Sequence, residues 1–267
     1  MTHRMPVLFV PHGAPTFALE PGPAGEALAR AAVALPRPRA IVMVSSHWET
    51  AVPTLGCAPR LETIHDYWGF PEALYDIEYP AVSDRDIAQE LFHLLDGKGF
   101  QPRLDDERGL DHGAWIPLRT MFPKADIPVI PLSIQGGQGP EYHFQLGEAL
   151  SSQPGKGILV VASGNVTHNL RDFQMALMQS SGTPAYVSRF ADWMWERIAA
   201  GDTDSVIGYR QLAPSAVRAH PTDEHLLPLH VALGAAGPGY RAERLYSGID
   251  NWVLAMDSYA LQPLLPS

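Results

Sequence analysis

Histidines follow three apolar stretches of the chain, and their positions suit a metal site assembled from distant segments. His12 comes directly after residues 6–11, His47 follows residues 42–46, and His168 lies shortly after residues 158–162. The chain has 11 histidines but one cysteine, so a metal site would use imidazole or carboxylate ligands instead of thiolates. Neutral imidazole binds Zn2+ and Fe(II), and three protein ligands leave coordination positions for water or substrate. The pattern therefore indicates a histidine-lined metal crevice.

Two further segments place histidines beside polar residues. His220 and His225 lie at the two ends of a segment that contains two acidic residues and precedes an expected helix. His112 stands between an aspartate and a glycine. We interpret four further histidines as non-functional. His3, His93 and His143 are expected at the surface, and His230 is expected to be a structural residue.

Alternating strands and helices must position these histidines. Continuously apolar runs such as residues 158–161 are typical of strands that are buried on both faces of a sheet. The expected strands are residues 6–10, 40–45, 127–134, 157–162, 244–247 and 253–256. The expected helices are residues 24–35, 142–150, 184–200 and 225–233, together with a helix that is capped within residues 83–86 and runs to Leu95. The alternation predicts a single α/β domain over residues 1–267, with a mainly parallel central sheet flanked by helices. Because ligands bind outside the carboxyl ends of such strands, we expect the histidines to meet in one crevice.

The composition excludes several classes of protein. Charged residues are 18% of the 267 residues and hydrophobic residues 46%, which excludes a disordered chain. The net charge of −10 argues against a nucleic-acid partner, because phosphate contacts need clustered Lys and Arg. Neither a targeting segment nor a membrane-spanning stretch is visible, so we expect a soluble cytoplasmic protein without a membrane partner. A homo-oligomer is compatible with the sequence, and Cys57 is expected to be a small buried strand residue.

Taken together, the histidine segments resemble the class III extradiol ring-cleavage dioxygenases. The resemblance is closest to the DOPA-dioxygenase type, which is related to the catalytic subunit of protocatechuate 4,5-dioxygenase. It rests on residues 11–15 (PHGAP), 45–49 (SSHWE), 65–71 (HDYWGFP), 110–115 (LDHGAW), 163–170 (SGNVTHNL) and 220–225 (HPTDEH). These segments occur in the family's order between residues 6 and 256, so the resemblance covers nearly the whole chain. Each segment is weak alone, but the ordered set is specific.

The resemblance implies a mononuclear metal centre, with Fe(II) for ring cleavage and Zn(II) as a metal often found in such proteins. His12, His47 and His225 match the family's ligands, although the neighbouring Glu224 leaves the third ligand open. His168 matches the catalytic acid/base histidine, and His112 matches a histidine that supports catalysis or contacts the substrate. The implied substrates are O2 and a small aromatic diol of catechol type.

Aromatic residues near these segments are candidates for the substrate pocket. Trp48, Phe17 and Tyr67 are expected to contact the substrate, together with His220. Trp68 and Trp115 are interpreted as core residues.

A zinc-dependent hydrolase is the alternative function. A zinc ion held by three histidines lowers the pKa of its bound water toward 7, and His168 would serve that reaction equally well. The sequence leaves open the ring substituents of the catechol, the ring bond that is cleaved and the native metal.

Overall fold

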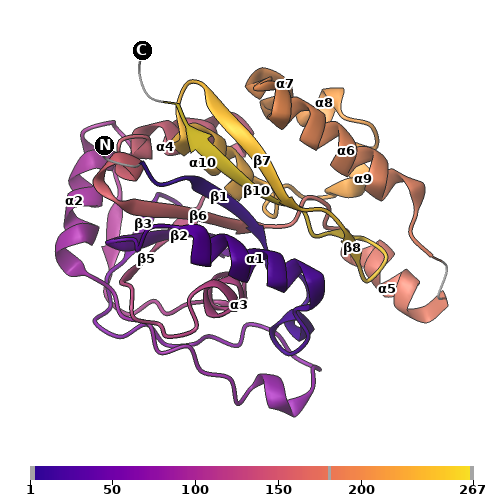
Figure 1. Cartoon of the computed structure of the whole chain (residues 1–267), viewed down its shortest axis with the longest axis horizontal. Helices are drawn as coiled ribbons and strands as arrows, with labels where there is room; N and C mark the ends of the chain where they lie inside the picture. Colours follow the sequence, from indigo (N-terminus) through magenta and orange to yellow (C-terminus); the bar gives the residue numbers. More distant parts are fainter. Residues whose placement is uncertain (1–3, 180–181, 265–267) are drawn as a thin grey trace.

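The central strands of the chain form a mixed eight-stranded sheet (Figure 1). The structure is a computed structural model that describes residues 4–179 and 182–264. Its strands are β1 (Val7–Pro11), β2 (Ala40–Glu49), β3 (Thr54–Gly56), β4 (Arg103–Asp105), β5 (Val129–Ile134), β6 (Ile158–Gly164), β7 (Tyr240–Tyr246) and β10 (Ser258–Pro263). The strand order is β4-β3-β5-β2-β6-β1-β10-β7, and β5, β2, β6 and β1 run parallel to one another. The predicted α/β fold with a mainly parallel central sheet is confirmed.

The strands near the edges run in mixed directions. β10 pairs antiparallel with both β1 and β7, and β3 pairs antiparallel with β5 but parallel with β4. Two short strands, β8 (Ile249–Asp250) and β9 (Leu254–Ala255), form a separate pair. The strand expected at 253–256 is therefore reduced to two residues outside the main sheet.

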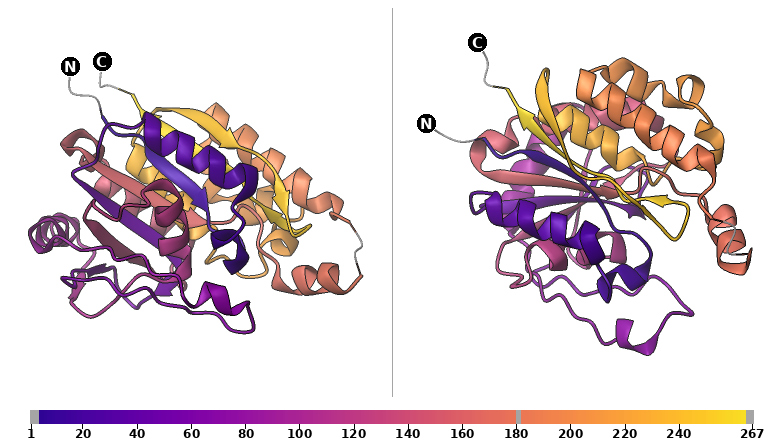
Figure 2. Two further views of the ribbon diagram at one scale, coloured as in Figure 1. Left: turned by 60° about the horizontal axis from the view of Figure 1, so that its bottom comes forward. Right: turned by 45° about the vertical axis from the view of Figure 1, so that its right-hand side comes forward.

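Helices cover both faces of the sheet. They are α1 (Gly22–Ala34), α2 (Arg85–Asp96), α3 (His112–Met121), α4 (Gly139–Leu150), α5 (Leu170–Gln179), α6 (Ala185–Ala200), α7 (Thr203–Ile207), α8 (Tyr209–Leu212), α9 (Ala216–Ala219) and α10 (Leu227–Ala236), with short 3-10 turns η1 (Pro15–Ala18), η2 (Glu72–Leu74) and η3 (Gln153–Lys156). Figure 1 shows α1 and α3 on one side of the sheet and α4 and α10 on the other. In Figure 2 the orange helices α6–α9 lie on the side of α10.

Successive strand residues supply two separate hydrophobic cores. In β1, Val7 and Phe9 pack with α4, α6 and α10, whereas Leu8 and Val10 pack with α1 and α3. This follows from the strand period of two, which sends neighbouring side chains to opposite faces. Because both faces are covered, the central strands are continuously apolar, as the sequence indicated.

The expected helices are all present with shifted ends, but other elements were not expected. The helix expected from residue 225 begins at Leu227, so His225 lies in the preceding loop. The chain also forms α3, α5 and β10, and α3 contains Pro117. Asp111 caps α3 by accepting a hydrogen bond from the backbone N–H of Ala114 at 3.1 Å. In the described part of the chain, no helix has the length and apolar character needed to cross a membrane.

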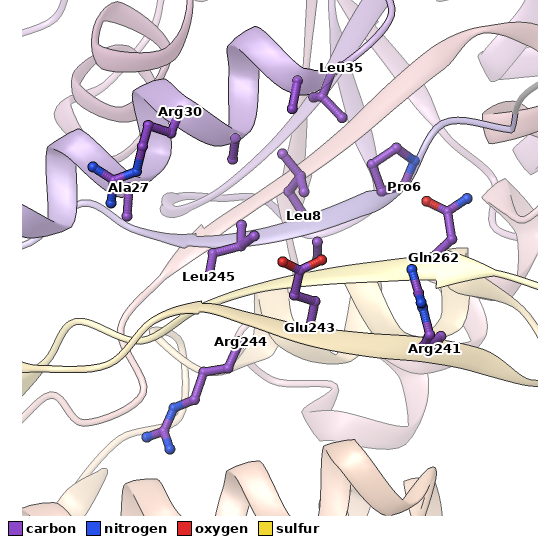
Figure 3. Close-up of a pocket in the computed structure, with 13 residues that line it drawn as sticks. Pro6, Leu8, Ala27, Arg30, Leu35, Arg241, Glu243, Arg244, Leu245 and Gln262 are labelled. Carbon is purple, nitrogen blue, oxygen red and sulfur yellow. The ribbon is translucent and has the colours of Figure 1, made fainter.

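A cavity of about 460 Å³ lies between α1 and the strands β1, β10 and β7. Figure 3 shows Arg30 of α1 and Arg241 and Glu243 of β7 around it, with Leu8 of β1 on its floor. The cavity lies on the face of the sheet, away from the carboxyl ends of the strands.

Candidate metal centre

Three histidines from distant segments converge beyond the carboxyl ends of β1, β2 and β6. His12 follows β1, His47 lies near the end of β2, and His225 lies in the loop before α10. The Nε2 atom of His47 is 3.2 Å from Nε2 of His12 and 3.1 Å from Nε2 of His225. His12 and His47, which the strand pattern placed at this edge, therefore meet there, and His225 lies beside them.

The opposite ring nitrogen of each of these three histidines contacts a side-chain oxygen. Such a partner fixes the orientation and tautomer of the ring, with the proton on Nδ1 and the lone pair on Nε2. The partners are Ser163 Oγ for His12 at 3.0 Å, Asp66 Oδ2 for His47 at 3.4 Å and Glu224 Oε1 for His225 at 3.3 Å. All three lone pairs can thus face a common point.

Burial keeps the three rings neutral. It lowers the pKa of His12 and of His225 well below the usual value, and neighbouring histidines lower both further. Burial and the nearby His112 lower the pKa of His47 to about 3. Neutral imidazole is the form that binds a metal ion.

The donor set fits a divalent metal ion. Metal–nitrogen bonds of about 2.0–2.1 Å in a tetrahedral site place ligand nitrogens about 3.4 Å apart, close to the spacing here. Three neutral Nε2 lone pairs that face one another repel, and a cation between them removes that repulsion. His12, His47 and His225 together offer three such donors, and His112 lies close enough to His12 and His47 to form an alternative set with them.

His112 lies on one side of this trio. Its Nδ1 and its backbone nitrogen both lie 2.9 Å from Oδ1 of Asp66, and its ring centroid is 4.0 Å from that of His47. Burial alone would raise the pKa of Asp66, but the hydrogen bonds from His112 and the nearby His47 lower it to about 2. The ionised Asp66 holds the proton of His112 on Nδ1, which leaves Nε2 available to the crevice.

His168 lies on the other side of the trio. Its ring stacks on that of His225, with centroids 3.4 Å apart and planes 4° apart. Burial, with the nearby His47 and His112, lowers the pKa of His168 to about 3, so this ring is also neutral. The ligand atoms of His168, Glu224 and His225 lie within 4.8 Å of one another, as do those of His12, His47 and His112.

The end of β6 holds the loop that carries His225. The backbone N–H of Asn165 donates to the carbonyl of His225 at 3.1 Å. A Cβ atom at Gly164 would lie 2.1 Å from the same carbonyl oxygen. Only glycine permits this approach of the two backbones, so Gly164 sets the position of the third histidine.

A cavity of about 450 Å³ opens in front of the histidines. His12, His47, His112, His168 and His225 all contribute to its wall. Aromatic and aliphatic side chains form most of the remainder, which suits a flat apolar ligand. They are Tyr67, Trp68, Phe70, Leu170, Phe173 and Leu254.

Of the residues expected to contact the substrate, only Tyr67 lines this cavity. Trp48 is buried, because it follows His47 in β2 and points to the opposite side, where the Arg108 guanidinium lies 5.5 Å from its ring. Phe17 is a residue of η1 and is buried in the hydrophobic core. His220 is fully buried, and its Nε2 donates to the carbonyl of Val166 at 2.7 Å.

Two expectations about burial were wrong. Trp68 was expected in the core, but 86% of its surface is exposed at the rim of the cavity. His143 was expected at the surface, but it is fully buried: its Nε2 accepts from the backbone N–H of Gln135 at 3.0 Å, and its Nδ1 donates to the carbonyl of Gly139 at 2.6 Å. Trp115 is in the core as expected.

The other histidine and cysteine expectations were largely met. His93 is exposed and His230 is fully buried, with both ring nitrogens near backbone carbonyls. Cys57 is buried directly after β3, and His3 lies outside the described residues.

Sequence reasoning assigned no role to Asp66 or Ser163. Asp66 lies in the segment HDYWGFP that carried the resemblance, directly between a histidine and a tyrosine. Ser163 is the penultimate residue of β6, at the edge where the ligands were expected. Their positions in the sequence could have marked Asp66 and Ser163 as candidate site residues, but only the folded structure shows which histidine ring nitrogens they contact.

Comparisons with known proteins agree with this arrangement. Residues 7–253 match the model of the catalytic LigB subunit of aromatic ring-opening dioxygenase. The chain is 36% identical to a 4,5-DOPA dioxygenase extradiol of Beta vulgaris, over 94% of both chains. It is 39% identical to the protein of the same name from Escherichia coli (strain K12), over 87% of this chain and 85% of the relative.

A solved structure also resembles this fold. The crystal structure of an uncharacterized protein from Escherichia coli K12 superposes with a TM-score of 0.79 at 31% identity. The match covers 96% of this chain and 99% of the other.

Proposed function

Because the chain belongs to the family of the catalytic LigB subunit of aromatic ring-opening dioxygenases, we propose that it cleaves the ring of a catechol-type substrate with O2 in an extradiol reaction. The curated relatives are named for 4,5-DOPA, which is a catechol. Fe(II) is the metal proposed for activity, and Zn(II) is a further ion that the same ligands would bind.

One observation carries the proposal: three neutral Nε2 atoms converge, and a side-chain oxygen holds the opposite nitrogen of each ring. Two additional histidines flank this trio, which a closed structural metal site would not need. When bound, Fe(II) would supply a positive charge for both hydroxyl oxygens of the catechol and an open position for O2.

The two flanking histidines are proposed to move protons. His168 stacks against His225 on the cavity wall, so a hydroxyl group of a bound catechol comes within reach of its ring edge. It is proposed to take the hydroxyl proton as a general base and to return it later as a general acid. His112, held by Asp66 at Nδ1, is proposed to donate or accept a proton at Nε2 on the opposite side.

The apolar residues of the cavity are proposed to orient the ring and to exclude water. Tyr67, Phe70 and Phe173 supply aromatic surface in front of the histidines. A flat ring between such side chains is held in one plane, which presents its diol edge to the metal ligands.

The test is reconstitution of the metal-free protein with Fe(II) under anaerobic conditions. A panel of catechols is then added with oxygen, and oxygen uptake and visible absorbance are followed. Consumption of one O2 per catechol with a new visible absorbance is expected. Absence of oxygen uptake with every catechol, together with esterase or amidase activity of the zinc form, would instead support the hydrolase.

A further inference from the structure

We propose that the histidine cavity selects catechols whose ring substituent is uncharged or carries an ammonium group, and discriminates against substituents that end in a carboxylate. This inference rests on the proposed function and specifies its substrate class. It differs from what the names of the relatives imply, because the side chain of DOPA carries both an ammonium and a carboxylate group.

The first argument is the charge of the cavity wall. Its acidic residues are Asp66 and Glu224, whose side chains are 25% and 24% exposed. Among the described residues that line the cavity, there is no Lys or Arg. A carboxylate in this cavity would find no cation from the protein, and it would meet two groups of like charge.

Three arginines close to the site do not line the cavity. Arg108 donates to Oδ2 of Asp111 at 3.0 Å and to the backbone carbonyl of His47 at 3.5 Å, and its guanidinium covers Trp48. Arg218 donates to Asp172 at 2.9 Å. Arg171 follows Leu170 in α5, but only Leu170 faces the cavity, since successive helix residues are rotated by about 100°.

The cavity between α1 and the strands β1, β10 and β7 has a similar volume and provides a useful contrast. Arg30 and Arg241 both line it, as Figure 3 shows, so cationic side chains are present on this protein at another concave surface. The lack of Lys and Arg among the described residues of the histidine cavity is therefore a specific property of that cavity, because arginines line a concave surface elsewhere on the protein.

The second argument is the apolar outer wall. The diol end of a catechol points to the histidines, so its ring substituent extends toward Trp68, Phe70 and Phe173. Phe70 and Phe173 are partly buried, so placing a carboxylate against them removes water from the charge without supplying a hydrogen-bond donor. An ammonium group is tolerated better, because aromatic faces and the Glu224 carboxylate both attract a cation.

The test compares catechols that share one ring and differ in the end of the substituent. They are 4-propylcatechol, dopamine, 3-(3,4-dihydroxyphenyl)propanoate and L-DOPA. We expect kcat/KM of the Fe(II) enzyme for the propanoate to be at least about tenfold below that for 4-propylcatechol, with dopamine equal to or above 4-propylcatechol and L-DOPA between dopamine and the propanoate. Equal or higher kcat/KM for the propanoate would overturn the inference.

Binding provides a readout that does not depend on turnover. Calorimetric titration of the zinc-loaded protein with the same catechols should give the same order of affinities. If the catechols bind or react but the protein shows no preference among their substituents, the proposed function stands and the proposed selectivity is refuted. Failure of every catechol to bind or react refutes both.

Gln174 offers a matched pair of variants at the rim. It lines the cavity from α5, is exposed, and forms no hydrogen bond with any of the five histidines of the cavity wall. Gln174→Arg should raise the propanoate-to-propylcatechol ratio of kcat/KM by about tenfold, and Gln174→Glu should lower it while favouring dopamine. If both variants leave the ratio unchanged, charge at the wall does not control selection, and the inference is wrong.

Discussion

The rings of His168 and His225 lie parallel, with centroids 3.4 Å apart. The two residues nevertheless have different neighbours, because Nε2 of His225 faces His47 whereas His168 lies outside the trio. The proximity places a proton-transfer group directly beside a proposed metal ligand. Substitutions at these two neighbouring positions should therefore have different effects, one on metal binding and the other on turnover.

The first prediction separates these two roles. His225→Ala should lose stoichiometric metal, because only two of the converging nitrogens remain. His168→Ala should retain metal but lose turnover by a factor of about 10²–10⁴, the usual contribution of general acid–base catalysis. Metal analysis and steady-state kinetics measure both effects, and stoichiometric metal in purified His225→Ala would refute the ligand assignment.

The second prediction concerns the partner of two histidines at once. Asp66→Asn should weaken metal binding by about 10–100-fold, because the carboxylate that orients His47 is lost. It should also reduce kcat of the metal-saturated enzyme through His112. The control is Asp96→Asn at the exposed end of α2. Competition with a chelator measures the affinity, and identical affinities in the two variants would contradict the role of Asp66.

The third prediction tests the close contact at the end of β6. Gly164→Ala should destabilise the protein by about 1–3 kcal/mol, because the new methyl group overlaps the His225 carbonyl. It should also weaken metal binding by displacing the loop. Gly137→Ala is the control, since no atom lies within 4 Å of its added Cβ. Urea denaturation compares the two, and an equal midpoint would show that the loop moves freely.

The fourth prediction concerns pH and a histidine remote from the ligands. Burial lowers the pKa of His230 to about 4, although nearby backbone carbonyls partly oppose this. Between this value and about 6.5 the unfolded chain binds more protons, so lowering the pH within this window destabilises the folded protein. From pH 7 to pH 5 this one residue should remove about 2 kcal/mol.

Comparison with a variant isolates this contribution. In metal-free protein, His230→Gln should show a smaller loss of unfolding free energy between pH 7 and pH 5 than the unmodified chain. His93→Gln, at an exposed position of α2, should show the same loss as the unmodified chain. An unchanged pH dependence in His230→Gln would mean that the pKa of His230 is the same in the folded and unfolded states.

The sequence predicted the parts of the fold that follow from periodicity. Apolar runs located β1, β2, β5 and β6, and their carboxyl ends located His12 and His47. The start of α3 at His112 was missed, because a glycine and Pro117 disguise a helix that Asp111 caps. β10 was missed because it mixes polar and apolar residues.

Local sequence could not show which polar side chains meet. Asp66 and His47 are 19 positions apart in the chain, and Ser163 and His12 are 151 apart, so their contacts depend on the complete fold. The same reason explains the errors at Trp68 and His143. An exposed tryptophan at a cavity rim and a buried histidine that bonds to backbone groups both run against the usual burial of their residue types.

The spacing of the converging histidines has a consequence for biosynthesis. His225 is synthesised 178 residues after His47. β1 also gains its partner β10 only after that point. With the proposed ligands, a nascent chain therefore lacks one donor until this late segment has emerged, and loading of the ion would be coupled to formation of the complete sheet.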